Sequence, residues 1–125
     1  MVSYKLILPE HMNHYGSLFG GNLLKWVDEV AWIAVSQEYP GGNFVTIGMD
    51  HVEFRKGCGL HSVLRFDVNR IREGNTSVSY RVIVVRRSLD CCEEEEIFHT
   101  EITFVRIGKD GKKLSLRAPV CSCCK

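Results

Sequence analysis

Hydrophobic and polar residues alternate with a period of two in five stretches of the chain, which is the pattern of β-strands that bury one face. The first stretch covers residues 4–8, and Pro9 ends it because proline has no N–H group to donate to a neighbouring strand. The other four stretches are residues 45–54, 64–69, 78–84 and 98–107. The pattern therefore predicts one strand near the start of the chain and four strands in its second half.

A single long helix is predicted between the first strand and the other four. Residues 22–37 contain neither glycine nor proline, and they lie between the pair Gly20 and Gly21 and the sequence Pro-Gly-Gly at 40–42. This length corresponds to about four to five turns. Leucine, valine, alanine, isoleucine and tryptophan side chains cover most of its circumference, so we expect the helix to be buried.

The order of these elements predicts an α+β fold in which one antiparallel sheet wraps around a long central helix. Consecutive strands joined by short turns usually pair antiparallel, and residues 88–96 are expected to form a solvated hairpin connection. One helix cannot cover both the open edges and the outer face of such a sheet. Pairing with a second copy of the chain would cover them, so we expect a homo-oligomer.

Length and composition are those of an ordinary globular domain. With 125 residues, 45% of them hydrophobic, we expect one domain over residues 1–125, in which about 108–125 form a C-terminal extension with a mobile tail. We find no export signal and no apolar stretch of about 18 residues, so we expect a cytoplasmic protein without membrane insertion. The six cysteines are then reduced thiols, and we expect no metal site.

The formal net charge of +1 conceals an uneven distribution along the chain. Residues 1–54 carry a net charge of −4, residues 55–87 carry +6 and residues 88–125 carry −1. A net charge this close to zero does not predict a nucleic-acid partner. The basic middle block would suit phosphate groups, which arginine and lysine bind well.

Two features of the helix could carry chemistry. A carboxylate such as Asp28 is costly on an almost wholly apolar helix unless it is partnered or has a function, the alternative being an ion pair with Lys25. Gly20 and Gly21 leave N–H groups at the positive end of the helix, where an oxyanion can bind, although two glycines also form ordinary turns. Gly21 and Asp28 lie roughly 10 Å apart along the axis, so one reacting carbonyl contacts both only if one comes from a neighbouring protomer.

Residues 11–31 read H-x-N-x-x-G-x-L-F-G-G-x-x-L-x-W-x-D-E-x-A, which resembles the signature of the hotdog-fold acyl-CoA thioesterases of the cytosolic acyl-CoA hydrolase type. Residues 45–56 and the sequence R-E-G-N-T-S at 72–77 resemble further parts of that family, and the likeness covers about residues 3–107. The resemblance implies a hotdog fold whose protomers pair into a double hotdog, with three such dimers often forming a hexamer.

The same resemblance implies hydrolysis of acyl-CoA thioesters to a free carboxylic acid and CoA. Asp28 would act as general base or nucleophile, and Asn13 from the opposite protomer would hold the substrate or the water. The N–H groups of Gly20 and Gly21 would polarise the thioester carbonyl. No cofactor is implied, because coenzyme A is part of the substrate and the product.

The resemblance also implies CoA-binding residues in the basic middle of the chain. They are Arg55, Lys56, Arg72, Gly74, Thr76 and Ser77. The chain departs from the family at residues 57–62, where the usual proline and Gly-Asp pair are missing. This departure alters the loop beside the expected CoA site.

Two alternative functions stay open at this point. The same fold hosts enoyl-thioester hydration or dehydration, for which His11 or His14 could serve, although we expect both histidines to make structural contacts. A non-catalytic acyl-CoA-binding module is the other alternative. Asn13 could also form an Asx-type turn within its glycine-containing loop. The length of the acyl chain cannot be read from the sequence.

Overall fold

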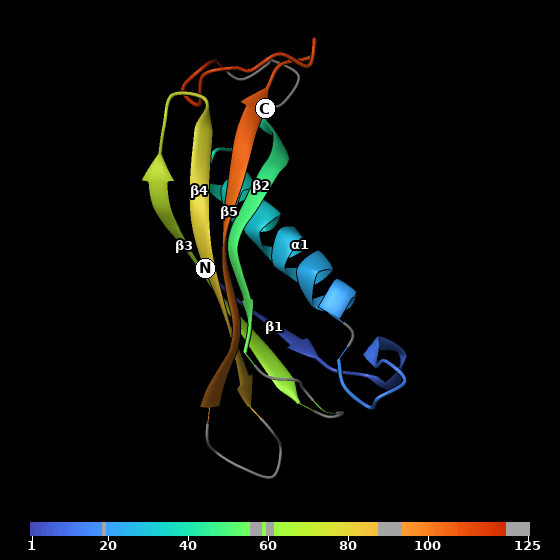
Figure 1. The fold of residues 1–125 in the computed structure, drawn as a ribbon. Helices are drawn as coiled ribbons and strands as arrows, with labels where there is room; N and C mark the ends of the chain where they lie inside the picture. The colour runs from blue at the N-terminus through green and yellow to red at the C-terminus, as the bar shows by residue number, and fades with distance from the viewer. Residues whose placement is uncertain (19, 56–58, 60–61, 88–93, 120–125) are drawn as a thin grey trace.

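The computed structural model describes residues 1–18, 20–55, 59, 62–87 and 94–119 (Figure 1). Within these residues it contains β1 (Val2–Leu6), η1 (Pro9–His11), α1 (Gly20–Glu38), β2 (Asn43–Phe54), β3 (Val63–Glu73), β4 (Ser77–Arg87) and β5 (Glu94–Ile107). The type and order of the strands and of the long helix agree with the sequence prediction. The short 3-10 helix η1 lies in a segment that we expected to be a loop.

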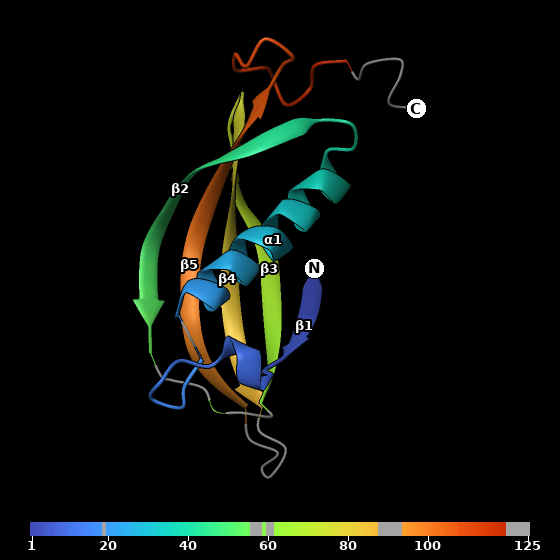
Figure 2. The same ribbon diagram turned by 90° about the vertical axis from the view of Figure 1, so that its right-hand side faces the viewer.

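The five strands form one antiparallel sheet in the order β1-β3-β4-β5-β2, so β1 and β2 are its edges. The sheet is curved and α1 lies on one side of it (Figure 1), running diagonally across the central strands (Figure 2). The predicted arrangement of one long helix against an antiparallel sheet is therefore confirmed. None of the helices in the described ranges is long and apolar enough to cross a membrane.

The helix α1 begins at the glycine pair and ends just before the Pro-Gly-Gly sequence. The N–H group of Tyr39 donates to the carbonyl oxygen of Val35 at 2.9 Å, which closes the last turn. Pro40 cannot continue the helix, and Gly41 has a φ of 80°, which glycine adopts without a steric penalty. The side chains buried beneath the helix are Leu23, Trp26, Val27, Val30, Ala31, Ala34 and Val35.

The sheet covers only one side of α1 in the single chain. Trp32 and Ile33 remain 46% and 42% exposed, so the expected burial of the whole helix circumference is not met here. A single sheet contacts one face of a helix, and apolar residues on the opposite face need another neighbour.

The alternation of hydrophobic residues in β3, β4 and β5 identifies the core correctly. The side chains that these strands bury are Leu64, Phe66, Val68, Val78, Tyr80, Val82, Val84, Phe98, Ile102 and Phe104. Phe66 pairs with Val84, and Val84 pairs with Phe98, so the buried residues form continuous rows across the three strands. These rows make the platform on which α1 rests.

The edge strand β2 departs from the predicted alternation. The sequence places Val45 and Ile47 on the hydrophobic face, yet they are 41% and 60% exposed. Thr46 pairs with Phe104 instead, and the register shifts between Thr46 and Gly48, where Ile47 is an extra residue. Such a bulge reverses the faces of the residues that follow it, which a pattern of alternating residues cannot reveal.

The structure also corrects the bounds of the connection between β4 and β5 and shows how the segment after β5 is held. Strand β5 begins at Glu94, opposite Arg87, so the hairpin connection is shorter than the expected 88–96, and residues 88–93 lie outside the described part. The Nη1 group of Arg106 lies within hydrogen-bond distance of the carbonyl oxygens of Ser115, Leu116 and Ala118 and donates to them, which holds the C-terminal segment against the sheet. All six cysteines, including those of the expected mobile tail, lie outside the described residues.

One prediction concerns Tyr80, a fully buried residue whose hydroxyl has no hydrogen-bond partner among the described residues. Burial, followed by the nearby Glu38 carboxylate, raises the pKa of Tyr80 far above its usual value. Because an unpartnered buried hydroxyl is destabilising, we expect Tyr80→Phe to raise the free energy of unfolding by about 1 kcal/mol in urea denaturation. Tyr39→Phe is the control and should lower it slightly, because the Tyr39 hydroxyl accepts a hydrogen bond of 3.1 Å from Arg70. A clear loss of stability in Tyr80→Phe would contradict the account.

Candidate active site

Asp28 lies in the middle of α1, and its carboxylate contacts the edge strand β2. Its Oδ1 atom accepts a hydrogen bond of 2.7 Å from the Thr46 hydroxyl. No described group donates to Oδ2, and no ion pair joins Asp28 to Lys25, so the alternative of a simple helix ion pair is not what the structure contains. A half-buried carboxylate with one oxygen held and the other available is suited to accept a proton.

Thr46, the partner of Asp28, is not among the residues that the sequence indicated. The alternation of Val45 and Ile47 placed this threonine on the polar face of its strand. The available signal was Phe44, which shares a face with Thr46 and is buried. Thr46 lies two residues after the buried Phe44, so alternation counted from Phe44 places its hydroxyl on the inner face. Alternation counted back from the residues after the bulge at Ile47 gives the opposite face.

The first turn of α1 places backbone N–H groups beside an aromatic ring. This turn contains no acidic side chain, so the partial positive charge at the start of the helix keeps its effect on a bound ligand. A Cβ atom placed on Gly20 would lie 3.5 Å from Cε1 of Phe54, in ordinary contact with the ring. The amides of Gly20 and Gly21 can therefore donate to a developing oxyanion next to the Phe54 ring.

Asn13 lies in the loop between η1 and α1, where it forms the Asx-type turn that the sequence left open. Its side-chain oxygen accepts hydrogen bonds from the N–H groups of Tyr15 (2.9 Å) and Ser17 (3.2 Å). The same loop is tied to the first turn of α1, because the Asn22 amide donates to the carbonyl oxygen of His11 at 3.1 Å. The Asn13 NH₂ group has no partner among the described residues and can donate to a substrate or a water molecule.

The two histidines beside Asn13 make local contacts. His11 accepts a hydrogen bond of 3.0 Å from the N–H group of Leu8, and its ring meets Trp26 edge-on at 4.8 Å. His14 is exposed, and its ring contacts the Tyr15 ring at a tilt of 40°. His11 makes the expected structural contacts, and its Nε2 atom also lies 3.9 Å from Oε1 of Glu10.

The residues expected to bind CoA fall at two ends of the sheet. The N–H group of Arg55 donates to Ile97 of β5, whereas Arg72 pairs with Ser79, which in turn pairs with Thr103 of β5. Residues 97 and 103 are six positions apart, which corresponds to about 20 Å in an extended strand. Arg55 and Arg72 of one protomer therefore cannot hold the same phosphate group.

The turn between β3 and β4 contains the other residues expected to bind CoA. The Gly74 N–H group donates to the carbonyl oxygen of Ser77 at 2.7 Å, and the Thr76 carbonyl oxygen accepts from Arg106 at 2.9 Å. These contacts fix the backbone of the turn and leave its hydroxyl groups at the surface. Lys56 lies outside the described residues.

Most arginines of the basic block are neutralised by carboxylates across the sheet. The ion pairs at 3.3 Å or less are Arg55–Glu96, Arg55–Glu53, Arg65–Glu94, Arg65–Asp67, Arg70–Glu38, Arg81–Glu101 and Arg86–Glu95. The net charge of +6 is therefore not a free basic surface. Arg72 is exposed and has no ion-pair partner within the described ranges, which makes it the best-placed of the expected phosphate ligands.

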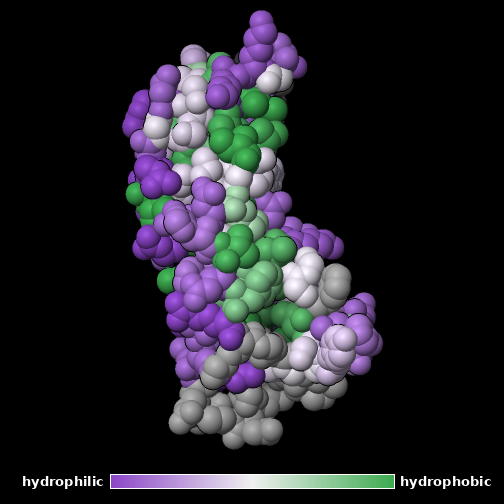
Figure 3. Space-filling view, viewed as in Figure 1, coloured by the Kyte–Doolittle hydropathy of each residue, from purple (hydrophilic) through white to green (hydrophobic). Residues whose placement is uncertain are grey.

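The side of the molecule around β2 is open and hydrophobic. Figure 3 shows apolar side chains gathered over this strand, where Val45, Ile47, Val52 and Phe54 are exposed. Two surface hollows, of about 430 Å³ and about 530 Å³, include neither Asp28 nor the glycine pair, and the first is lined in part by His51, Val52 and Glu53 of β2. In the single chain β2 therefore carries an exposed apolar surface.

Comparison with known proteins places these features in a family. The Thioesterase superfamily matches residues 15–93. The chain is 34% identical to acyl-coenzyme A thioesterase 11 of Mus musculus over 92 residues, which are 74% of this chain and 15% of that protein. It is 28% identical to an uncharacterized acyl-CoA thioester hydrolase of Bacillus subtilis over 112 residues, which are 90% of this chain and 64% of that protein. The chain thus spans less than two thirds of the length of either relative.

The fold agrees with this family. A hexameric hotdog-fold thioesterase of Campylobacter jejuni superposes on the chain with a TM-score of 0.83 and 28% sequence identity, over 90% of this chain and 86% of that one. The expected hotdog fold is therefore confirmed. The matched residues include the glycine pair, Asp28 and Thr46, and they cover more than half of the chain. The chain belongs to the Thioesterase superfamily.

Proposed function

We propose that this protein hydrolyses acyl-CoA thioesters to a free carboxylic acid and CoA, and that it does so in the cytoplasm. The observation that carries the proposal is the Asp28 carboxylate, which Thr46 holds on the open side of the sheet. The glycine N–H groups at the start of α1 supply the second requirement of the reaction, donors for an oxyanion. The acyl-CoA thioesterase and thioester hydrolase among its relatives support this class of substrate.

Asp28 acts as the general base in this proposal. Its Oδ2 atom takes a proton from a water molecule while the water oxygen attacks the carbonyl carbon of the thioester. The carbonyl oxygen gains negative charge and accepts hydrogen bonds from the N–H groups of Gly20 and Gly21. The C–S bond then breaks, and the CoA thiolate leaves with the electron pair. Thr46 keeps Oδ1 in place, so that Oδ2 faces the water.

Two protomers supply one site. Gly21 and Asp28 of one helix are separated by roughly 10 Å along the axis, too far for one carbonyl to contact both. The exposed residues Val45 and Ile47 on the unpaired edge of β2 give a second copy a surface to cover. The hexameric state of the Campylobacter jejuni thioesterase supports pairing into a double hotdog. Asn13 and the glycine pair then come from one protomer, and Asp28 with Thr46 from the other.

The shared site predicts complementation between inactive subunits. We expect Asp28→Ala and Asn13→Ala each to lower kcat for acyl-CoA hydrolysis, Asp28→Ala by about 100-fold or more because the base is lost. When the two variants are dissociated, mixed and reassociated, thiol-release assays should show that activity returns, because some sites then receive both intact residues. As a control, mixing Asp28→Ala with Thr46→Val should give no gain, since both residues lie on the same side of the site. No recovery in the first mixture would contradict the shared site.

The Thr46 contact predicts a selective loss of rate. Removing a hydrogen bond to a charged group is worth about 1.5–3 kcal/mol, so Thr46→Val should lower kcat at least about 10-fold, with little change in KM. Thr46→Ser retains the hydroxyl and should keep most of the rate. Steady-state kinetics on one acyl-CoA are sufficient to compare the three proteins. Equal activity of Thr46→Val and the natural protein would rule out the positioning role.

The exposed Arg72 predicts a contribution to binding of the nucleotide part of CoA. Arg72→Ala should raise KM for acyl-CoA by about 10-fold while kcat stays unchanged, because a charge-assisted hydrogen bond to phosphate is lost. The same variant should hydrolyse an acyl-pantetheine, which lacks the nucleotide, as well as the natural protein does. Arg87→Ala, an exposed arginine at the opposite end of β4, serves as the matched control. Equal KM increases in both variants would argue against a specific contact.

A further inference from the structure

The second bulge of β2 lies where this strand approaches the start of α1. Asp50 pairs with Glu101 and Glu53 pairs with His99, so two residues of β2, His51 and Val52, stand against the single residue Thr100 of β5. One extra residue in a strand moves each side chain that follows it to the opposite face of the sheet. The bulge therefore decides which side chains at the end of β2 face the helix.

The register shows what the bulge exchanges. Phe54 pairs with Phe98, which is buried on the helix side of the sheet, and the two rings lie 4.9 Å apart. In an unbroken strand, Glu53 would take the place opposite Phe98 and Phe54 would point to the outer face. A carboxylate would then lie close to Gly20, where the proposed reaction develops negative charge. The bulge places the Phe54 ring beside Gly20 and keeps the Glu53 carboxylate away from it.

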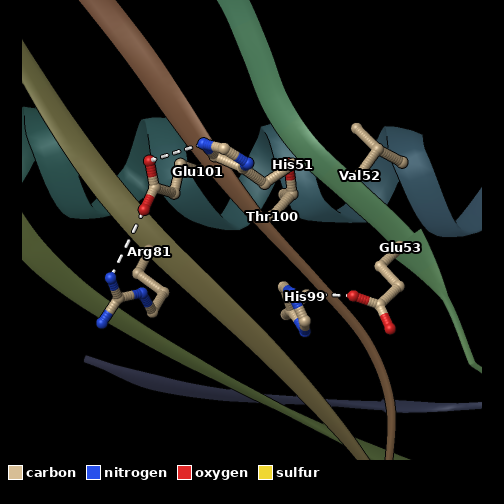
Figure 4. A pocket seen from close by; sticks show the side chains of 7 residues that line it. All are labelled: His51, Val52, Glu53, Arg81, His99, Thr100 and Glu101. Atoms are coloured by element: carbon tan, nitrogen blue, oxygen red, sulfur yellow. Dashed lines mark hydrogen bonds and ion pairs between the residues drawn. The ribbon is translucent and has the colours of Figure 1, made fainter.

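A hydrogen bond and two ion pairs surround the bulge, whose backbone is strained at His51. The buried hydroxyl of Thr100 donates to the carbonyl oxygen of Asp50 at 2.7 Å. His51 has a φ of 55°, in the left-handed region that non-glycine residues rarely adopt, and such backbone strain persists only where its surroundings impose it. On the outer face, Glu53 meets His99 at 3.4 Å (Figure 4) and Arg55 at 3.3 Å. Figure 4 also shows the His51 and Arg81 side chains converging on Glu101, with α1 behind the strands.

Phe54 is well placed to limit the acyl group. Its ring is in van der Waals contact with the position of a Gly20 Cβ atom, at 3.5 Å, and 52% of the residue is still exposed. A thioester whose carbonyl oxygen is bound by the first N–H groups of α1, with its acyl side turned toward β2, has its α-carbon next to this ring. Substituents on the α-carbon then compete with the ring for space, whereas a straight chain passes alongside it.

We propose that the bulge at His51 and Val52 positions Phe54 as a wall of the acyl pocket, and that Phe54 selects straight-chain acyl groups over acyl groups branched at the α-carbon. The inference rests on the proposed thioesterase activity. Phe54 is the specificity-determining residue, and Thr100 and His51 are positioning residues that act through it. The proposal concerns the shape of the pocket and leaves the proton transfer by Asp28 as described above.

The test compares butyryl-CoA with isobutyryl-CoA, two thioesters with the same number of carbon atoms. Phe54→Ala should raise the ratio of kcat/KM for isobutyryl-CoA to that for butyryl-CoA by about 10-fold or more, the effect of one methyl group in an apolar pocket. Thr100→Val, which removes the hydroxyl that holds the bulge, should raise the ratio in the same direction. Combining the two substitutions should add nothing to Phe54→Ala alone, because Thr100 acts through Phe54. Tyr4→Ala, an exposed aromatic residue on the far edge strand, is the control.

A second pair of variants separates backbone conformation from side-chain loss at the bulge. His51→Gly adopts the left-handed conformation freely and should keep the natural ratio, whereas His51→Val opposes it and should shift the ratio toward that of Phe54→Ala. A ratio in Phe54→Ala within twofold of the natural one, or a full Thr100→Val effect in the Phe54→Ala background, would overturn the inference while the proposed function stands. If the natural protein hydrolyses neither thioester nor any other acyl-CoA, the proposed function fails and the inference fails with it.

Discussion

The hydrogen bond between Thr46 and Asp28 joins the middle of α1 to the edge strand β2, and the candidate site is arranged around it. A carboxylate on a helix that is otherwise apolar must be compensated, and here the compensation comes from a neutral hydroxyl instead of a cation. A lysine or arginine partner would place a positive charge beside the carboxylate. A single hydroxyl fixes the orientation and leaves one oxygen for chemistry.

The strand that supplies Thr46 is irregular beyond this contact. The inner strands β3, β4 and β5 bury continuous rows of side chains and provide the platform for α1, although their registers shift between Arg70 and Arg72 and between Val84 and Val85. Strand β2 departs from a regular register twice, once after Thr46 and once after Asp50. The first departure lies directly after Thr46, whose side chain faces α1. The second turns Phe54 toward Gly20. At the second place a bulge in an edge strand directs a side chain at the start of α1, which is a recurring use of bulges beside active sites.

The sequence predicts the regular parts of this structure well, because each is encoded locally. The helix is bounded by glycine and proline, and most buried side chains of the three inner strands follow the alternation of hydrophobic residues, so their faces could be assigned from the sequence. The site was less accessible. Asp28, Asn13 and the glycine pair were identified through the resemblance to hotdog-fold acyl-CoA thioesterases, and Asp28 also through its unusual place on an apolar helix.

Features that depend on register across strands could not be predicted. Thr46 lies directly before the first register shift of β2 and Phe54 lies after the second, and an alternating pattern does not show where a register shifts. The basic block likewise looked like a phosphate-binding surface, but pairs such as Arg65–Glu94 and Arg86–Glu95 join residues about 10 to 30 positions apart and cancel much of its charge. Asn13 carries two roles at once, since its oxygen closes a turn while its NH₂ group remains available.

The central claim is that one thioester lies between the first turn of α1 from one protomer and the Asp28–Thr46 pair from another. A crystal structure of the Asp28→Ala variant with uncleaved butyryl-CoA tests it most directly. The account predicts that the thioester oxygen accepts hydrogen bonds from the N–H groups of Gly20 and Gly21 of one protomer, while its carbonyl carbon lies beside Thr46 and position 28 of the other. A thioester contacted by a single protomer, or bound away from position 28, would contradict the account.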